Sequence, residues 1–362
     1  MRRLCSASDS QSSDDKGFNP QLKVRGNYMQ AAILIIGFNR PKLLKKLLST
    51  VPLSNTRRIY ISIDGPRHPN DVIRVNQVRA LVEAFAIHNP KVEIRYRFSE
   101  QNLGCKSGVT AAIDWAFESE DSLIILEDDI VVSEEFFTYM DYFLNHFKSD
   151  LQIWHINGFS PLLPPYKNQF SYLTKFAHVW GWATWKNRWV EYDRELSAYQ
   201  PGKLLQTKSL TTNPLSEDAL IFFERNLAAC KEGFDTWDFQ WQFSMWLKGG
   251  IAVSPGERLS GNSGFGQTAS HTKFAGFKGL DLPPAKKISS QYRDVNLAKQ
   301  SDLLEQLHEA IIFGVRSQFN DFEFNPKTKM QIFLRSFPKW THLKFVRACK
   351  KLSQPFKILN RL

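Results

Sequence analysis

The feature that most constrains this chain is an alternation of short aliphatic runs with longer amphipathic stretches between residues 30 and 150. Each aliphatic run has the length of a strand, and each is followed by a stretch with helical spacing of apolar residues. The runs are "AAILIIGF", "RIYISID", "VEIRYRF" and "SLIIL". Strands spaced by helices of this length indicate βαβ units, and so an α/β, Rossmann-like, mostly parallel sheet with helices on both faces.

Polar residues follow the four runs, at the points where the strands are expected to end. These segments are "FNRP", "DGP", "SEQNLG" and "EDD". The carboxyl ends of parallel strands meet at one edge of the sheet, and open α/β sheets bind their ligands there. The sequence therefore predicts that polar and charged side chains converge on a ligand site at this edge.

Three consecutive carboxylates, Glu127, Asp128 and Asp129, directly follow the fourth aliphatic run. Like charges that are buried together raise one another's pKa unless a cation lies among them. A divalent metal ion that bridges carboxylates and diphosphate oxygens would meet this requirement. The alternative is a solvated turn, after which Ser133 caps a helix whose first residues are Glu134 and Glu135.

Several protein classes are disfavoured by motifs that the chain lacks. Neither GxGxxG nor GxxxxGK[ST] follows the first run, which argues against ordinary Rossmann dehydrogenases and P-loop enzymes. The four cysteines have no CxxC or Cys/His spacing, so a zinc site or disulfide framework is not expected, and a reducing compartment fits best. No apolar run approaches the roughly 18 residues of a membrane-spanning helix.

Composition divides the chain into a leader, a body and a tail. Residues 1–29 are expected to be a disordered leader without the apolar core of a secretory signal. Residues 30–320 are expected to form one domain, with a regular half at 30–150 and a less regular half at 151–320. Residues 326–362 hold ten Lys or Arg and no Asp or Glu, so most of the net charge of +11 lies in this tail.

The tail mixes basic residues with Phe, Trp, Leu and Ile. This composition suits an interfacial segment on an anionic membrane surface. Nucleic-acid binding is the rival interpretation, although no recognition motif accompanies the tail, and a helix packed on the body is a third. We expect no nucleic-acid partner and a cytoplasmic protein, peripheral at the inner face of the membrane.

An ordered set of motifs resembles the GT-A nucleotide-diphospho-sugar transferases, closest to the N-acetylglucosaminyltransferase I type and its bacterial relatives. In chain order the motifs are "ILIIGFNRP", "ISIDGP", "NLG", "LIILEDDIVVSEEFF", "GWATW", "WDFQW" and "SGNSGFG...SHT". The resemblance implies that residues 30–150 form a nucleotide-sugar half and residues 151–320 an acceptor half. It further implies Mn²⁺ or Mg²⁺ bound by Asp129. It also implies a set of donor-binding residues, namely Arg40, Asp64 at the uracil, Asn102, Gly104, Glu127, Asp128 and His271.

The segment "TWDFQW" contains the position that resembles the family's catalytic aspartate, here Asp238. An inverting transferase needs a carboxylate that removes the proton from the attacking acceptor hydroxyl. The family has a second acid where this chain has Phe239, which weakens any transfer of acceptor specificity. A cap of the following helix is the alternative role for Asp238.

Aromatic residues near these motifs are candidates for acceptor binding. Trp180, Trp182 and Trp237 are predicted to form a sugar-stacking surface, although buried aromatics more often belong to the core. Downstream, Gly261, Gly264 and Gly266 suit the hinge of a loop that orders over the donor.

The sequence thus predicts a metal-dependent, inverting transferase for polysaccharide biosynthesis. Its partners would be a UDP-sugar donor and a glycan or lipid-linked saccharide acceptor. Two alternatives stay open at this point: a metal-dependent nucleotide-sugar hydrolase, and a non-catalytic protein that binds sugars or nucleotides.

Overall fold

The computed structural model describes residues 29–161, 170–202, 204, 215–264, 284 and 309. Its strands are β1 (Ala32–Gly37), β2 (Ile59–Ile63), β3 (Ile94–Phe98), β4 (Ser122–Glu127), β5 (Ile130–Val132), β6 (Ile153–Asn157), β7 (Tyr172–Thr174), β8 (Trp182–Trp185), β9 (Ile251–Ser254) and β10 (Ser260–Asn262). Its helices are α1 (Pro41–Leu48), α2 (Pro69–His88), α3 (Gly104–Phe117), α4 (Phe136–His146), α5 (Lys186–Trp189), α7 (Glu217–Lys231) and α8 (Asp238–Leu247).

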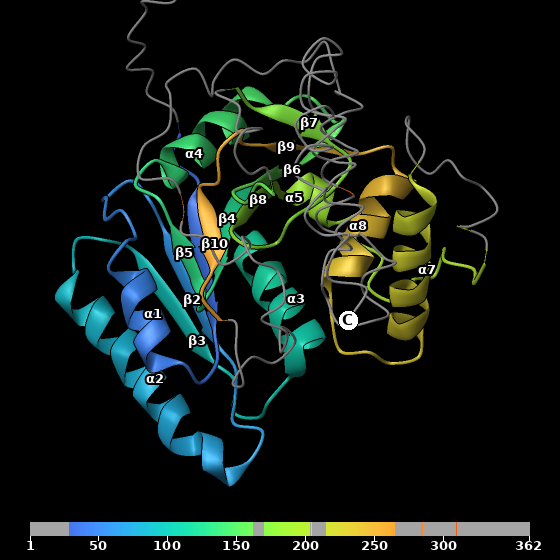
Figure 1. The fold of residues 1–362 in the computed structure, drawn as a ribbon. Coiled ribbons are helices and arrows are strands. Elements are labelled where there is room, and N and C mark those ends of the chain that lie inside the picture. The colour runs from blue at the N-terminus through green and yellow to red at the C-terminus, as the bar shows by residue number, and fades with distance from the viewer. Residues whose placement is uncertain are drawn as a thin grey trace, which may run out of the picture.

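One large sheet organises the described part of the chain, with strand order β3-β2-β1-β4-β8-β6-β9-β7 (Figure 1). The first four strands in this order are parallel to their neighbours. Strand β8 then runs antiparallel to both β4 and β6, while β9 is parallel to β6 and β7 closes the edge antiparallel to β9. The predicted α/β class with a mostly parallel sheet is confirmed, and its second half is mixed.

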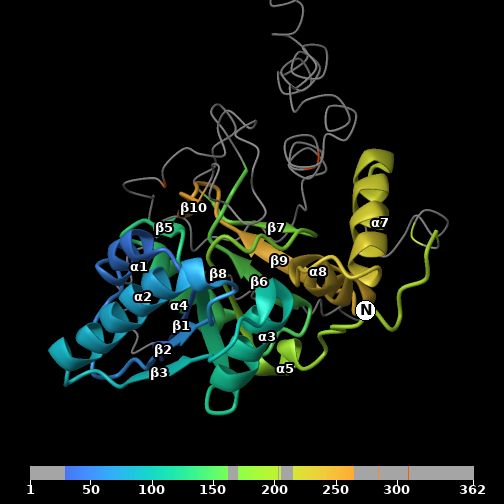
Figure 2. The same ribbon diagram turned by 90° about the horizontal axis from the view of Figure 1, so that it is seen from below.

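Helices cover both faces of the sheet because the strand residues alternate between two cores. On β1, Ile33 and Ile35 join α1, α2 and α4 in one apolar cluster. Leu34 and Ile36 point the other way and join α3, α7 and α8 in a second cluster. Figure 2 shows α1 and α2 on one side of β1, β2 and β3, and α3 on the other. Burial on both faces explains why β1, β2 and β4 are nearly continuous apolar runs, whereas the partly exposed edge strand β3 contains two arginines.

Local sequence signals account for the elements of residues 30–150. Helix α1 begins at Pro41, whose fixed φ and missing N–H suit a first helical position, and it buries Leu44, Leu47 and Leu48. Helix α2 begins with Pro69 in the same way. The four predicted strand and helix pairs of this half are all present.

The second half contains strands that the sequence analysis did not predict. Strand β8, "WATW", is buried along its whole length and therefore shows no alternation of polar and apolar residues. Strand β10 lies within the segment expected to be a glycine-rich loop, and it pairs antiparallel with β5, directly after the three carboxylates. Both strands in this small ribbon are three residues long, too short for a pattern to be recognised.

The leader at 1–28, His271, Gly266 and the tail at 326–362 lie outside the described residues, so the predictions made for them stay predictions. The predicted domain limits are likewise untested. Within the described ranges, no helix combines the length and the hydrophobicity needed to cross a membrane.

A buried ion pair connects the core to a residue far downstream. The Lys175 Nζ lies 2.7 Å from Glu309 Oε1, and both side chains are almost fully buried. The second oxygen of Glu309 accepts a hydrogen bond from the backbone N–H of Ser216, the residue that caps α7. Glu309 therefore neutralises a core lysine and holds the start of a helix at the same time.

We predict that Glu309→Gln lowers the free energy of unfolding by about 3–5 kcal/mol, because a buried ion pair loses its negative partner while the Lys175 ammonium stays in the core. The matched control is Glu191→Gln, which breaks an exposed ion pair with Lys248 and should cost no more than about 1 kcal/mol. Urea unfolding of both variants measures the difference. Equal losses would show that the Lys175 pair is not energetically distinct from a surface pair.

Candidate active site

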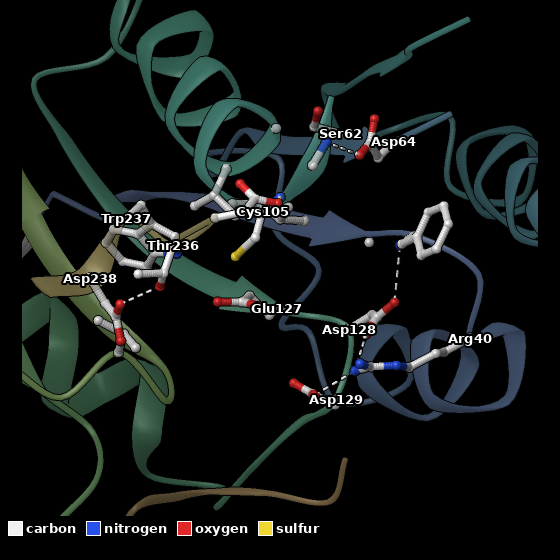
Figure 3. Close-up of a pocket in the computed structure, with 18 of the residues that line it drawn as sticks. Arg40, Ser62, Asp64, Cys105, Glu127, Asp128, Asp129, Thr236, Trp237 and Asp238 are labelled. Carbon is white, nitrogen blue, oxygen red and sulfur yellow. Dashed lines mark hydrogen bonds and ion pairs between the residues drawn. The ribbon is translucent and has the colours of Figure 1, made fainter. Parts of the chain in front are cut away.

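A cavity of about 450 Å³ opens at the carboxyl ends of β1, β2 and β4. The sheet edge supplies one part of its wall, the first residues of α3 supply a second, and the segment before α8 supplies a third (Figure 3). Of the residues predicted as functional, ten line this cavity: Arg40, Asp64, Asn102, Gly104, Glu127, Asp128, Asp129, Trp180, Trp237 and Asp238. The fold thus brings together residues from both halves of the chain.

The three carboxylates lie at the end of β4, and an arginine from the loop after β1 neutralises two of them. Arg40 Nη1 lies 3.2 Å from Asp128 Oδ1 and 2.5 Å from Asp129 Oδ2. The other oxygen of Asp128 accepts the backbone N–H of Phe38 at 3.1 Å. Both aspartates are buried, which is incompatible with the solvated turn considered as the alternative.

Ser133 does not act as the helix cap that this alternative required. Helix α4 begins at Phe136, its N-cap residue is Glu135, and no side chain makes a capping hydrogen bond there. The strand β5 occupies the residues between the carboxylates and α4. The acidic segment is therefore a tight link between two strands.

Burial and mutual repulsion make the cluster difficult to ionise completely. Burial, followed by the charges of Asp129, Asp128 and Asp238, raises the pKa of Glu127 to about 8. Burial also raises the pKa of Asp128 to about 7, although the Arg40 guanidinium opposes this rise. One arginine thus leaves the carboxylates short of positive charge at neutral pH, and an additional cation would be favourable here.

The donor atoms of this cluster fit a hard divalent cation such as Mn²⁺ or Mg²⁺. Within the ranges described, no group of three or more His, Cys, Asp or Glu side chains is arranged to enclose a metal ion. Asp129 nevertheless faces the cavity, and the Arg40 guanidinium already stands in as a cation on its Oδ2 atom. The arrangement suits an ion held through Asp129 whose other ligands come from phosphate oxygens and water.

The carboxylate of Asp64, which directly follows β2, accepts hydrogen bonds from the neighbouring loop and from the start of α3. Its oxygens accept backbone N–H groups of Gly65, Leu103 and Gly104 and the side-chain amide of Asn102, at 2.8–3.2 Å. Burial raises the pKa of Asp64, and the hydrogen bonds from these backbone groups oppose the rise. Asp64 therefore lies at the cavity wall with both oxygens already accepting hydrogen bonds, and its predicted contact with uracil stays a prediction.

The amino end of α3 is held by a second carboxylate from the other half of the chain. Asp235 accepts the backbone N–H groups of Cys105 and Lys106, both at 2.8 Å. A Cβ atom on Gly104, which has φ +79°, would lie 2.7 Å from this carboxylate. Gly104 and Asn102 thus help to build the cavity wall, and their predicted roles in donor binding stay predictions.

Asp238 is the first residue of α8, and one of its oxygens is fixed by two hydrogen bonds. Thr236 Oγ1 donates to Asp238 Oδ1 at 2.5 Å, and the Phe239 backbone N–H donates to the same atom at 3.0 Å. Among the described residues, Oδ2 has no hydrogen-bond partner. The carboxylate therefore presents one committed oxygen and one that is available to a ligand in the cavity.

The predicted sugar-stacking surface is corrected by the structure for Trp182. Its ring is only 1% exposed and is stacked between His155 and Trp237, at centroid distances of 4.7 and 5.4 Å. Trp182 therefore belongs to the core beneath the cavity and offers no face to a saccharide. Trp180 is partly exposed at the cavity wall, and Trp237 lines the cavity although its ring is almost fully buried.

Several cavity residues were not predicted from the sequence. Arg67 lies over the Phe38 ring at 4.7 Å, so a cation–π pair joins the loops after β1 and β2. Arg67 could have been predicted as a cavity residue, because it lies three residues after Asp64 in a loop expected at the site. Thr236 belongs to the "TWDFQW" segment that contains Asp238, whereas Asp235 gave no signal, because only the packing of α8 against the sheet brings it to the cavity.

The ribbon of β5 and β10 fixes the position of Asp129 from its other side. Both the backbone N–H and the hydroxyl of Ser263 donate to the Asp129 carbonyl oxygen at 2.9 Å. The next residue, Gly264, lies so close that a Cβ atom would be 2.2 Å from Asp129 Oδ2. Gly264 was predicted to be a hinge, and here it provides space for the carboxylate.

Comparisons with known proteins give little further guidance. No protein-family model matches the chain, and no curated protein matches it significantly. A solved structure, the mannosyltransferase PcManGT from Pyrobaculum calidifontis in complex with GDP-Man and Mn²⁺, is similar with 10% identity and a TM-score of 0.36. The similarity covers 61% of this chain and 70% of that chain, and it is too weak to support an argument about function. The narrower resemblance to the N-acetylglucosaminyltransferase I type is not supported.

We predict that Gly264→Ala weakens Mn²⁺ binding by about 10- to 100-fold, since the added methyl group must displace the Asp129 carboxylate. Calorimetric titration of Mn²⁺ measures this change. Gly108→Ala is the control in the same cavity, because its Cβ atom would meet its nearest neighbour at an ordinary 3.4 Å. Equal metal affinity in the two variants would contradict a role for Asp129 as a metal ligand.

Proposed function

We propose that the protein is an inverting glycosyltransferase that moves a sugar from a UDP-sugar to a hydroxyl group of a glycan or lipid-linked saccharide. The observation that supports it is that Asp129 and Asp238, from the two halves of the chain, line one cavity at the carboxyl edge of the sheet. Besides burial, the negative charges of Asp129 and Asp238 both contribute to the raised pKa of Glu127, which lies between them in the cavity wall. The site therefore combines acidic residues suited to a cation with a separate carboxylate suited to proton removal.

In this proposal Asp129 and the donor's diphosphate oxygens hold a divalent cation. That cation would neutralise the charge that develops on the departing nucleoside diphosphate. Asp128 keeps the loop after β1 in place through the Phe38 backbone N–H. The tryptophans beneath the cavity limit the access of water, which would otherwise compete with the acceptor.

Asp238 is proposed as the general base. Its free Oδ2 atom takes the proton of the acceptor hydroxyl while the acceptor oxygen forms the new bond to the anomeric carbon. The bond between that carbon and the diphosphate oxygen breaks on the opposite face, and the nucleoside diphosphate leaves with the bonding electron pair. Thr236 holds Oδ1, so the carboxylate cannot turn away from the cavity.

The Asp64 carboxylate already accepts hydrogen bonds from Asn102 and Leu103, so it would not recognise uracil alone. The nucleobase would then be bound by other groups of the same wall, among which Arg67, Ser99 and Phe38 face the cavity. Donor identity is therefore best determined by a panel of UDP- and GDP-sugars. Trp180 and Trp237, which line the same cavity, are proposed to contact the acceptor, and the tail predicted to contact the membrane lies outside the described residues.

We predict that Asp129→Ala lowers the affinity for nucleoside diphosphate in the presence of Mn²⁺ at least about 100-fold, because the metal ion loses its protein ligand. Asp238→Asn should leave this affinity within about threefold. It should lower the rate of sugar transfer at least about 100-fold, because the general base is lost. Calorimetry gives the binding, and product detection with a saccharide acceptor panel gives the transfer. Consumption of nucleotide sugar without a glycoside product would favour a hydrolase. Unchanged turnover in Asp238→Asn would remove this residue as the base.

We predict that Thr236→Val lowers kcat about 10- to 100-fold with little change in the KM for the donor, because the carboxylate of Asp238 loses the hydrogen bond that orients it. Thr236→Ser keeps the hydroxyl and should restore most of the rate. Steady-state kinetics of both variants provides the measurement. Equal losses in the two would indicate a packing role for the methyl group.

A further inference from the structure

In this structure the positive charge beside Asp128 and Asp129 is supplied by the guanidinium group of Arg40. A single nitrogen of Arg40, Nη1, contacts both Asp128 and Asp129. The arginine side chain is 24% exposed and lies on the cavity wall, so it has space on the ligand side. Arg40 immediately precedes α1, whose first turn carries no acidic residue that would hold the guanidinium elsewhere.

This contact conflicts with a metal ion bound by Asp129. A divalent ion binds a carboxylate oxygen at about 2.0–2.2 Å, and Asp129 Oδ2 already has the guanidinium nitrogen at 2.5 Å on one side and Gly264 close on another. If the ion used the other oxygen, it would still lie within a few ångströms of a positive charge, in a partly buried site where repulsion is weakly screened. Arg40 and the ion therefore compete for one carboxylate.

We propose that Arg40 is an internal counter-ion that a divalent cation displaces from Asp129, and that the displaced guanidinium then binds the diphosphate of the donor. The second part rests on the proposed function, while the first does not. Arg40 is suited to this exchange because a guanidinium can pair with carboxylate oxygens or with phosphate oxygens in the same bidentate manner. Metal binding and diphosphate binding would thus be coupled through the movement of one side chain.

The coupling has two consequences of opposite sign. Without Arg40, the ion meets no competitor, so Mn²⁺ should bind more tightly when it is added alone. The diphosphate, in contrast, loses a contact that only the displaced arginine provides. A purely structural role of Arg40 would weaken both interactions or neither.

The test uses the full chain at pH 8.0, with free Mn²⁺ measured by electron paramagnetic resonance and no nucleotide present. We expect Arg40→Met to bind Mn²⁺ at least about tenfold more tightly than wild type. The additional change Asp129→Asn should abolish this gain. Arg194→Met is the control, since Arg194 pairs with Asp114 and is not among the residues that line the cavity, and it should leave the Mn²⁺ affinity unchanged.

A second titration uses inorganic pyrophosphate on the Mn²⁺-saturated proteins. Here Arg40→Met should bind about tenfold more weakly than wild type. Circular dichroism and melting curves establish that each variant is folded, and Arg40→Lys, which keeps the charge, should retain wild-type-like competition with Mn²⁺. A folded Arg40→Met that binds Mn²⁺ no more tightly than wild type would overturn the proposal.

The two proposals can fail separately. Tighter Mn²⁺ binding by Arg40→Met in a protein that transfers no sugar would contradict the proposed function and support the counter-ion role. Sugar transfer by wild type together with unchanged Mn²⁺ affinity in Arg40→Met would overturn the counter-ion role alone.

Discussion

The constraint on which the site depends is the need for positive charge at the end of a strand that is buried on both faces. Strand β4 ends at Glu127 and is followed directly by the buried Asp128 and Asp129, so three carboxylates lie together at the end of this strand. Arg40, in the loop after the neighbouring strand β1, supplies part of this positive charge by forming ion pairs with Asp128 and Asp129. The parallel arrangement of β1 and β4 is what places an arginine and the carboxylates at the same edge.

The amino end of α3 is the second organising element. Its exposed backbone N–H groups are shared between Asp64, from the nucleotide half, and Asp235, from the segment before α8. A helix start normally attracts an anionic ligand. In this protein two of its own carboxylates occupy that position, so an anionic ligand of the cavity would have to be bound by other groups.

The parallel half of the fold could be predicted from the sequence. Its apolar strand runs alternate with helical stretches, and polar residues follow each strand. The sequence also identified Asp129, Asp238 and Arg40 as residues of one cavity, and the structure brings them there. It could not indicate that Trp182 lies beneath the cavity, since an aromatic residue in a short buried strand looks the same whether or not it faces a ligand. The partners of Asp64 were also hidden, because they are backbone groups whose direction depends on tertiary packing.

The double attachment of α3 has a consequence for how substitutions in this protein combine. Asp64 and Asp235 contact successive N–H groups of one rigid helix, so a change at either residue alters the position of a shared element. Free energies of substitutions usually add only when the sites share no partner. Double substitutions at Asp64 and Asp235 are therefore expected to be non-additive, and during evolution a change at one of these residues would restrict the changes that the other tolerates.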